Sequence, residues 1–321
     1  MQQNTAFGKM PKTNEELSDL LVSRGLVADK SDLIRILNAV GYYRLTGYLV
    51  PFKLPGSDNY CFGTSLTTVW DIYTFDRHLR LMTMDALARI EIAIRALIVK
   101  FHTAANQDPF AYTRHHNLPN ITEKQHAQLL SHIADAIHKA KESADIQHLA
   151  RKYGISDYPP VWMMMEHVPM GAVTFYYEGL PIIVQQSLAN TFFVRPSIFT
   201  GILMTLKNAR NICAHHSRFW NKRTKARITK RIGRDTHLAP FVECLERQPS
   251  FNYTSTFTVL SLCAYCMGII RPESKWKERC RALLKTATPF ILRGMRAPDD
   301  WETLAMWQSS YPAASVASED D

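Results

Sequence analysis

The most regular pattern of apolar positions in the chain runs from Ser65 to about Ala105. This stretch contains no proline and no internal glycine. Apolar residues recur in it three or four positions apart, which places them on one face of an α-helix. They are Leu79, Met82, Ala86, Ile90, Ala93 and Leu97. Acidic residues also precede arginines by four positions, an arrangement that stabilises a helix. We therefore predict one long helix here.

Capping residues and helix breakers predict further helices. Capping boxes that begin at Thr13 and Thr122 predict helices running to about Ser23 and Tyr153. Residues 31–39 are predicted to be helical, short helices are predicted in the stretch 161–194, and Pro196 suits the first turn of another. Further helices are expected at 239–247, 259–270, 272–285 and 299–308. No useful stretch alternates apolar and polar residues, so the predicted fold class is all-α.

Composition and the distribution of charged and polar residues suggest how the chain is organised. Of the 321 residues, 46% are hydrophobic and 21% charged, values typical of soluble globular proteins. We expect a flexible N-terminus at 1–12, a helical domain at 13–235, a helical C-terminal extension at 236–308 and a disordered tail at 309–321. The charge-free stretch Gln248–Ile270 favours a buried helix over a membrane span, because polar residues interrupt its first half. With no signal-peptide pattern, we expect a cytoplasmic protein without membrane contact.

Cysteines and histidines offer no convincing metal site. Six cysteines include one C-x-x-C pair, Cys263 and Cys266, which lies inside an apolar run and lacks a second ligand pair. Core packing is the favoured interpretation. The chain has twelve histidines, but none are three or four positions apart, the spacing that a helical metal site needs. There is also no glycine-rich phosphate loop and no G-x-S-x-G motif. We expect no metal and no cofactor.

Basic residues concentrate in one strip between Arg218 and Arg234, which contains no acidic residue. The chain's net charge is +9, and this strip carries most of it. A charge run often forms only a solvated face, but this density favours contact with nucleic-acid phosphates. The candidate RNA-binding residues are Arg218, Lys222, Arg223, Lys225, Arg227, Lys230 and Arg231. In such a contact Phe219 and Trp220 would be available to stack on unpaired bases.

Just before the strip, the segment Asn208–Asn221 crowds polar groups into an apolar neighbourhood. Asn211 and His215 are four apart and share a helix face, so the Asn211 amide could orient the imidazole. Arg210 lies about 140° away from His215 around an ideal helix. It must therefore reach round the helix, lie at its end, or meet a histidine of another chain.

An arginine and a histidine beside a basic strip suit cleavage of RNA. A neutral histidine can take the 2′-hydroxyl proton, and a guanidinium can hold the two non-bridging phosphate oxygens. No metal is required, because the nucleophile belongs to the substrate. The alternative is a structural polar network, and spacing alone favours it, since an arginine five residues before a histidine is common by chance.

The segment from Arg210 to Asn221 resembles the R-N-x-x-x-H motif of the HEPN superfamily, in the form found in AbiD- and AbiF-type abortive-infection proteins. The aromatic block Gly41–Tyr48 and the arginine-rich blocks at 73–80 and 89–95 resemble other parts of that family, in the same order. The resemblance covers roughly residues 10–225. It implies an HEPN-like helical bundle with additional N- and C-terminal helices.

The resemblance also implies a function in phage defence: metal-independent endoribonuclease activity, usually in a homodimer. Arg210 and His215 would be catalytic and Asn211 supporting. Residues that could assist them are Arg77, Arg80, Glu91, Arg95 and His216. The expected partner is RNA, and a regulating antitoxin or small RNA is left open.

Two other functions remain in view. One is a non-catalytic module of the same fold that binds RNA or a toxin partner. The other is a DNA-binding regulator, for which the sequence offers no convincing helix-turn-helix signature. The Tyr42–Tyr48 block could be core or an RNA platform.

Overall fold

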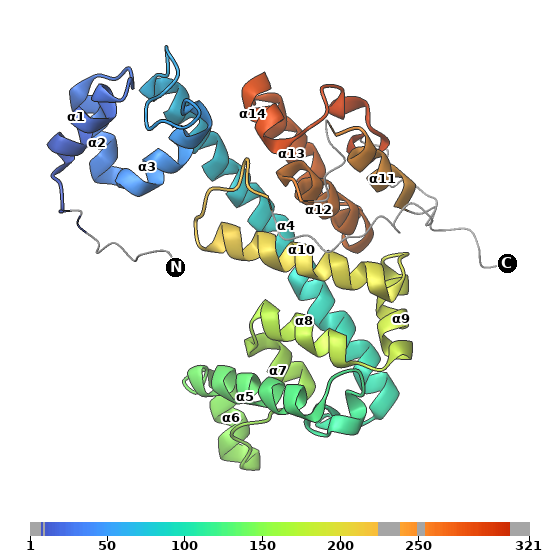
Figure 1. The fold of residues 1–321 in the computed structure, drawn as a ribbon. Helices are drawn as coiled ribbons and strands as arrows, with labels where there is room; N and C mark the ends of the chain where they lie inside the picture. The colour runs from blue at the N-terminus through green and yellow to red at the C-terminus, as the bar shows by residue number, and fades with distance from the viewer. Residues whose placement is uncertain (1–7, 9, 224–237, 249–253, 309–321) are drawn as a thin grey trace, which may run out of the picture. The chain divides into compact units, whose positions relative to one another are not determined.

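The structure is a computed structural model that describes residues 8, 10–223, 238–248 and 254–308. Every regular element in these residues is helical, with fourteen α-helices, short 3₁₀ turns and only isolated β-bridges. The all-α prediction is confirmed, while the HEPN arrangement stays a prediction. The chain divides into two compact units, residues 1–78 and 79–321, and α4 (Leu66–Asn106) continues from one into the other (Figure 1). The expected boundary at 235 lies outside the described residues, as do the tail and most of the N-terminus.

The first unit contains α1 (Asn14–Ser23), α2 (Lys30–Val40) and α3 (Tyr42–Leu49). The predicted capping box is present: the Glu16 amide donates to the Thr13 hydroxyl, and the Thr13 amide donates to the Glu16 carboxylate. Gly41 alone separates α2 from α3 and has a φ of 78°. Glycine reaches this conformation at little cost, so the chain can start a new helix without a longer loop.

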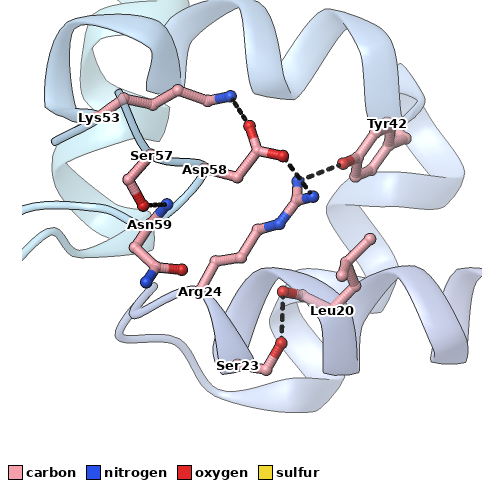
Figure 2. A network of polar contacts seen from close by, with 8 residues as sticks. All are labelled: Leu20, Ser23, Arg24, Tyr42, Lys53, Ser57, Asp58 and Asn59. Carbon is pink, nitrogen blue, oxygen red and sulfur yellow. Dashed lines mark hydrogen bonds and ion pairs between the residues drawn. The ribbon is translucent and has the colours of Figure 1, made fainter. Parts of the chain in front are cut away.

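A polar network connects the end of α1 with the start of α3 and the loop that follows it (Figure 2). The Arg24 guanidinium donates to the Asp58 carboxylate at 2.9 Å and to the Tyr42 hydroxyl at 3.3 Å. Lys53 donates to the other Asp58 oxygen at 2.6 Å. Asp58 is largely exposed, so each ion pair contributes little stability. Together these contacts position the loop.

The aromatic block at 42–48 contributes two residues, Leu45 and Tyr48, to the core. Its helix, α3, buries Leu45, Tyr48 and Leu49, and the Tyr48 hydroxyl donates to the Asp76 carboxylate at 2.6 Å. Tyr43 differs, because 84% of it is exposed. The block therefore does not form a continuous aromatic platform.

The second unit contains the part of α4 after His78 and all later helices. These include α5 (Glu123–Lys139), α6 (Ala144–Tyr153), α7 (Val161–His167), α8 (Met170–Gly179), α9 (Ile182–Thr191) and α10 (Pro196–Ala214). Helix α8 packs against both α5 and α10, and α10 also contacts α9 and α12. This packing surrounds α10 with other helices and so positions the motif near its C-terminal end.

The C-terminal helices belong to the same unit. They are α11 (Ala239–Glu246), α12 (Thr256–Ile270), α13 (Trp276–Lys285) and α14 (Pro289–Met295). Helix α12 is buried from Thr256 to Met267, which confirms that the charge-free stretch contributes to the core. Trp276 of α13 donates to the Met82 carbonyl of α4 at 2.8 Å. In the described residues, no helix is both long and apolar enough to span a membrane.

Two helix predictions were wrong. The stretch from Thr122 to Tyr153 is two helices, because α5 ends at Lys139 and the Ser143 hydroxyl donates to the Ala140 carbonyl in the connecting turn. Residues 299–308 form two 3₁₀ turns instead of an α-helix. The aromatic residues Trp301 and Trp307 of these turns are buried against each other, so tertiary packing determines the local structure.

Candidate functional site

Helix α10 carries the motif on a strongly anchored scaffold. Pro196 occupies its first turn, and its buried residues include Ile202, Leu206, Ala209 and Cys213. The helix ends at Ala214, where the His215 amide donates to the Asn211 carbonyl at 3.0 Å. Arg210 thus lies four residues before the end of the helix, and His215 is the first residue after the helix.

Arg210 is oriented by an acidic residue of α4. Its Nε lies 3.5 Å from Glu91 Oε2, and its side chain is 37% exposed. The other Glu91 oxygen accepts from Arg95 Nη2 at 2.5 Å. Arg95 is itself fixed, because it donates to the Met165 and Val168 carbonyls. The structure therefore brings the predicted residues Glu91 and Arg95 together behind Arg210.

The pairing leaves part of the Arg210 guanidinium available. Only Nε faces Glu91, and the two terminal nitrogens have no hydrogen bond or ion pair within the described part of the chain. A guanidinium held in this way can offer parallel N–H groups to two oxygens of one phosphate.

His215 lies in different surroundings. It is exposed, as is Asn211. In the described structure no hydrogen bond joins the Asn211 amide to the imidazole, and the two residues are linked through their backbones. His216 follows with a φ of 53°, where the chain leaves the helix direction. The supporting role predicted for Asn211 therefore stays a prediction.

A cavity of about 1100 Å³ lies beside Arg210. Residues of α4, α5, α7, α8 and α10 line it, together with the α7–α8 connection, and Glu91, Arg95 and Arg210 are among them. His215 and Asn211 are not. Arg210 and His215 thus face different surroundings, as their angular separation on a helix predicts.

The other candidate assisting residues do not line this cavity. Arg77 belongs to the first unit, where it forms a hydrogen bond with His78 at 2.9 Å. Arg80 is buried, and it does not line the cavity. Of the predicted assisting residues in the second unit, Glu91 and Arg95 line the cavity with Arg210.

The stacking role predicted for Phe219 and Trp220 was wrong. Both are buried, at 0% and 1% exposure. The Phe219 carbonyl accepts a hydrogen bond from Thr256 at 2.6 Å, and Trp220 packs against Phe290 and Gly294. A Cβ on Gly294 would lie 1.8 Å from the Trp220 ring. These aromatic side chains join the motif segment to the C-terminal helices.

The basic strip is only partly described. Arg218 is half-buried, whereas Lys222 and Arg223 are exposed. The remaining candidates, Lys225, Arg227, Lys230 and Arg231, lie outside the described residues, so the RNA-binding role of the strip stays a prediction.

The two thiols of the C-x-x-C pair are in the core. Cys263 and Cys266 are fully buried, and burial raises the pKa of Cys266 to about 12. This confirms core packing for the C-x-x-C pair. Within the described ranges no group of three or more potential ligand residues could hold a metal ion.

The sequence profile of the Abi-like proteins matches residues 35–221, which is more than half of the chain. The chain belongs to the Abi-like protein family. Neither the curated proteins nor the solved structures compared with it gave a match. The family region begins within α2 and ends at Asn221, so it includes Arg210, Glu91 and the whole cavity lining. Membership implies a part in abortive infection, a form of phage defence.

Several cavity residues were not predicted from the sequence. Lys207 precedes Arg210 by three positions, and that spacing alone could have suggested it. Glu178 of α8 had no comparable signal. His167 also lines the cavity, and its Nε2 lies 2.8 Å from Asp145. Hydrogen bonds from Ser143 and His167 lower the pKa of Asp145 to about 2.

Proposed function

We propose that this Abi-like protein is a metal-independent endoribonuclease of the HEPN type that acts in phage defence. The observation that carries the proposal is the orientation of Arg210. Glu91 holds its Nε side, and the terminal nitrogens are left for the non-bridging oxygens of a phosphodiester. Such a pre-organised cation stabilises negative charge as it develops at phosphorus.

His215 supplies the proton transfers in this proposal. Its neutral imidazole takes the proton of the ribose 2′-hydroxyl, and the 2′-oxygen attacks the adjacent phosphorus. The bond to the 5′-oxygen breaks, and that oxygen receives a proton from an imidazolium. The products are a 2′,3′-cyclic phosphate and a 5′-hydroxyl. This reaction needs no external nucleophile.

A homodimer reconciles this chemistry with the geometry. Since Arg210 and His215 of one chain face different surroundings, Arg210 of one copy and His215 of a second copy would act on the same phosphate. A two-fold dimer would form two such composite sites.

The test is cleavage of a labelled RNA by the purified full chain, with analysis of the product ends. We expect a 2′,3′-cyclic phosphate that His215→Ala abolishes, whereas His148→Ala, at an exposed position outside the cavity lining, retains activity. Salt-sensitive RNA binding without any turnover would instead support a non-catalytic module.

Chelation provides a separate test of the mechanism. In the proposed mechanism the 2′-hydroxyl of the RNA is the nucleophile and Arg210 stabilises the developing charge. The cleavage rate in excess EDTA should therefore equal the rate without EDTA. Loss of activity that one divalent ion restores would contradict the metal-independent mechanism.

A further inference from the structure

The cavity beside Arg210 is larger than the proposed reaction requires. One phosphate needs little more than the Arg210 guanidinium, yet the cavity has a volume of about 1100 Å³. Pockets of about 300–1,000 Å³ commonly hold whole small molecules. The extra space could therefore contain a further part of the substrate.

The charges that line the cavity restrict what it can bind. Four cationic side chains and four carboxylates contribute to the lining. A ligand that carried only negative charge would face the carboxylates, and a purely cationic ligand would face the arginines and lysines. The lining suits a ligand with an anionic end and a separate group of hydrogen-bond donors, which a nucleotide provides.

Two of these charged groups are half-buried and have no charged partner in the described residues. These are Lys207 and Glu178. The polar contact of the Lys207 ammonium is with the sulfur of Met204 at 3.2 Å, a weak acceptor. Half-buried charges without charged partners are poorly stabilised by the protein alone.

Apolar side chains accompany these groups. Phe175 lies three positions before Glu178 on α8, and Met204 lies three positions before Lys207 on α10. Residues three apart are neighbours on a helix surface. Because α8 and α10 are packed together, Phe175 and Met204 supply an aromatic and a thioether surface in the same cavity as the two charges.

We propose that this cavity binds one nucleotide of the RNA, next to the scissile phosphate, and selects guanine. Phe175 and Met204 contact the face of the base, Glu178 accepts hydrogen bonds from its edge, and Lys207 contacts the flanking phosphate. Unpaired bases are commonly recognised by stacking together with hydrogen bonds to their edges. The inference rests on the proposed ribonuclease function and names the substrate preference of the same site.

The preference for guanine follows from the chemistry of a carboxylate. An ionised Glu178 can only accept hydrogen bonds. Guanine presents its N1–H and N2–H groups side by side, which matches two carboxylate oxygens. Uracil presents one N–H between two carbonyls, and these would repel a carboxylate. Hydrogen bonds to charged groups predict roughly tenfold discrimination.

The test measures nucleotide binding by calorimetry on the full chain, independently of cleavage. Guanosine 3′-monophosphate should bind roughly tenfold more tightly than uridine 3′-monophosphate. Glu178→Gln should remove this discrimination, whereas Glu246→Gln, on an exposed site of α11, should keep it. Phe175→Ala should weaken both nucleotides. Lys207→Met should weaken guanosine 3′-monophosphate but not guanosine.

The outcomes separate the inference from the proposed function. Equal or absent binding of the two nucleotides by a protein that cleaves RNA would overturn the inference alone. Glu178-dependent guanosine nucleotide binding by a protein that cleaves no RNA would support the nucleotide site and overturn the ribonuclease proposal. Since Glu178→Gln preserves side-chain size, an unchanged melting temperature would confirm that the variant is folded.

Discussion

Arg210 and His215 are five positions apart, yet the two regions of the molecule that contain them differ in kind. Arg210 lies at a cavity and is oriented by Glu91, which Arg95 holds in turn. His215 is exposed at the end of α10, and in the described structure only its backbone makes a hydrogen bond. One chain therefore offers a pre-organised anion site and a separate, freely accessible base. In a composite site between two copies, the rigidly held Arg210 of one copy would meet the exposed His215 of the other.

The largest expected effect tests whether the two regions must meet. Arg210→Ala and His215→Ala should each reduce the cleavage rate by at least about 100-fold, because one removes charge stabilisation and the other the proton acceptor. An equimolar mixture of the two inactive variants should recover about a quarter of the wild-type rate. Half of randomly assembled dimers combine the two variants, and each of these retains one intact site.

The mixture requires matched controls. Arg151→Ala, at an exposed position of α6, should remain active alone, and each inactive variant mixed with itself should remain inactive. Recovery that fails even though the variants exchange subunits would show that Arg210 and His215 act within one chain.

A smaller effect tests the orientation of Arg210. Glu91→Gln keeps the shape of the side chain but removes the charge that holds the Arg210 Nε, so the cleavage rate should fall roughly tenfold through misplacement of the guanidinium. The dependence on His215 should be unaffected. In an Arg210→Ala background, Glu91→Gln should have no further effect on the residual rate, because the two residues act as a unit.

Independent effects of the two substitutions would contradict this role for Glu91. A purely structural role would appear as a lower melting temperature with the same fractional loss in both backgrounds.

The sequence predicted those parts of the fold that local pattern determines. The long helix was predicted from Ser65 to about Ala105, and α4 extends from Leu66 to Asn106. This prediction succeeded because the spacing of apolar residues and the absence of proline and glycine both indicate one uninterrupted helix. The break between α5 and α6 was missed, since it depends on one weak turn at 140–143. Helix α14 was also missed, although Thr288 caps it and Pro289 follows, a recognisable start signal.

The candidate site was predictable only in part, for a similar reason. The motif identified Arg210, and the resemblance directed attention to Glu91 and Arg95. Glu178 could not be found, because only the packing of α8 on α10 brings it to the same cavity. Phe219 and Trp220 were misjudged, since the helices that bury them lie beyond the recognised region.

A severalfold effect is expected from the exposed basic residues that follow His215. Replacing Lys222 and Arg223 with glutamine should weaken RNA binding and reduce its salt dependence. Each phosphate contact on a single strand contributes about 0.7 to the slope of log affinity against log salt, so the slope should fall by about 1.4. Cleavage of bound RNA should hardly change. An unchanged slope would show that these two residues form only a solvated face.

The smallest effect on cleavage is expected at His102, a histidine that contrasts with His215. His102 is fully buried, and its ring nitrogens have no hydrogen-bond partner in the described structure. Burial lowers its pKa from 6.5 to about 4. The unfolded chain therefore binds a proton between these pH values and the folded chain does not, so folding stability falls as the pH decreases through this window.

The loss of folding stability attributable to His102 approaches about 3 kcal/mol below pH 4. Denaturant unfolding at pH 7 and pH 4 should show that His102→Phe reduces the acid-induced loss by about this amount. Neutral-pH cleavage by His102→Phe should match wild type. An equal acid-induced loss in His102→Phe and wild type would assign the acid sensitivity to other groups.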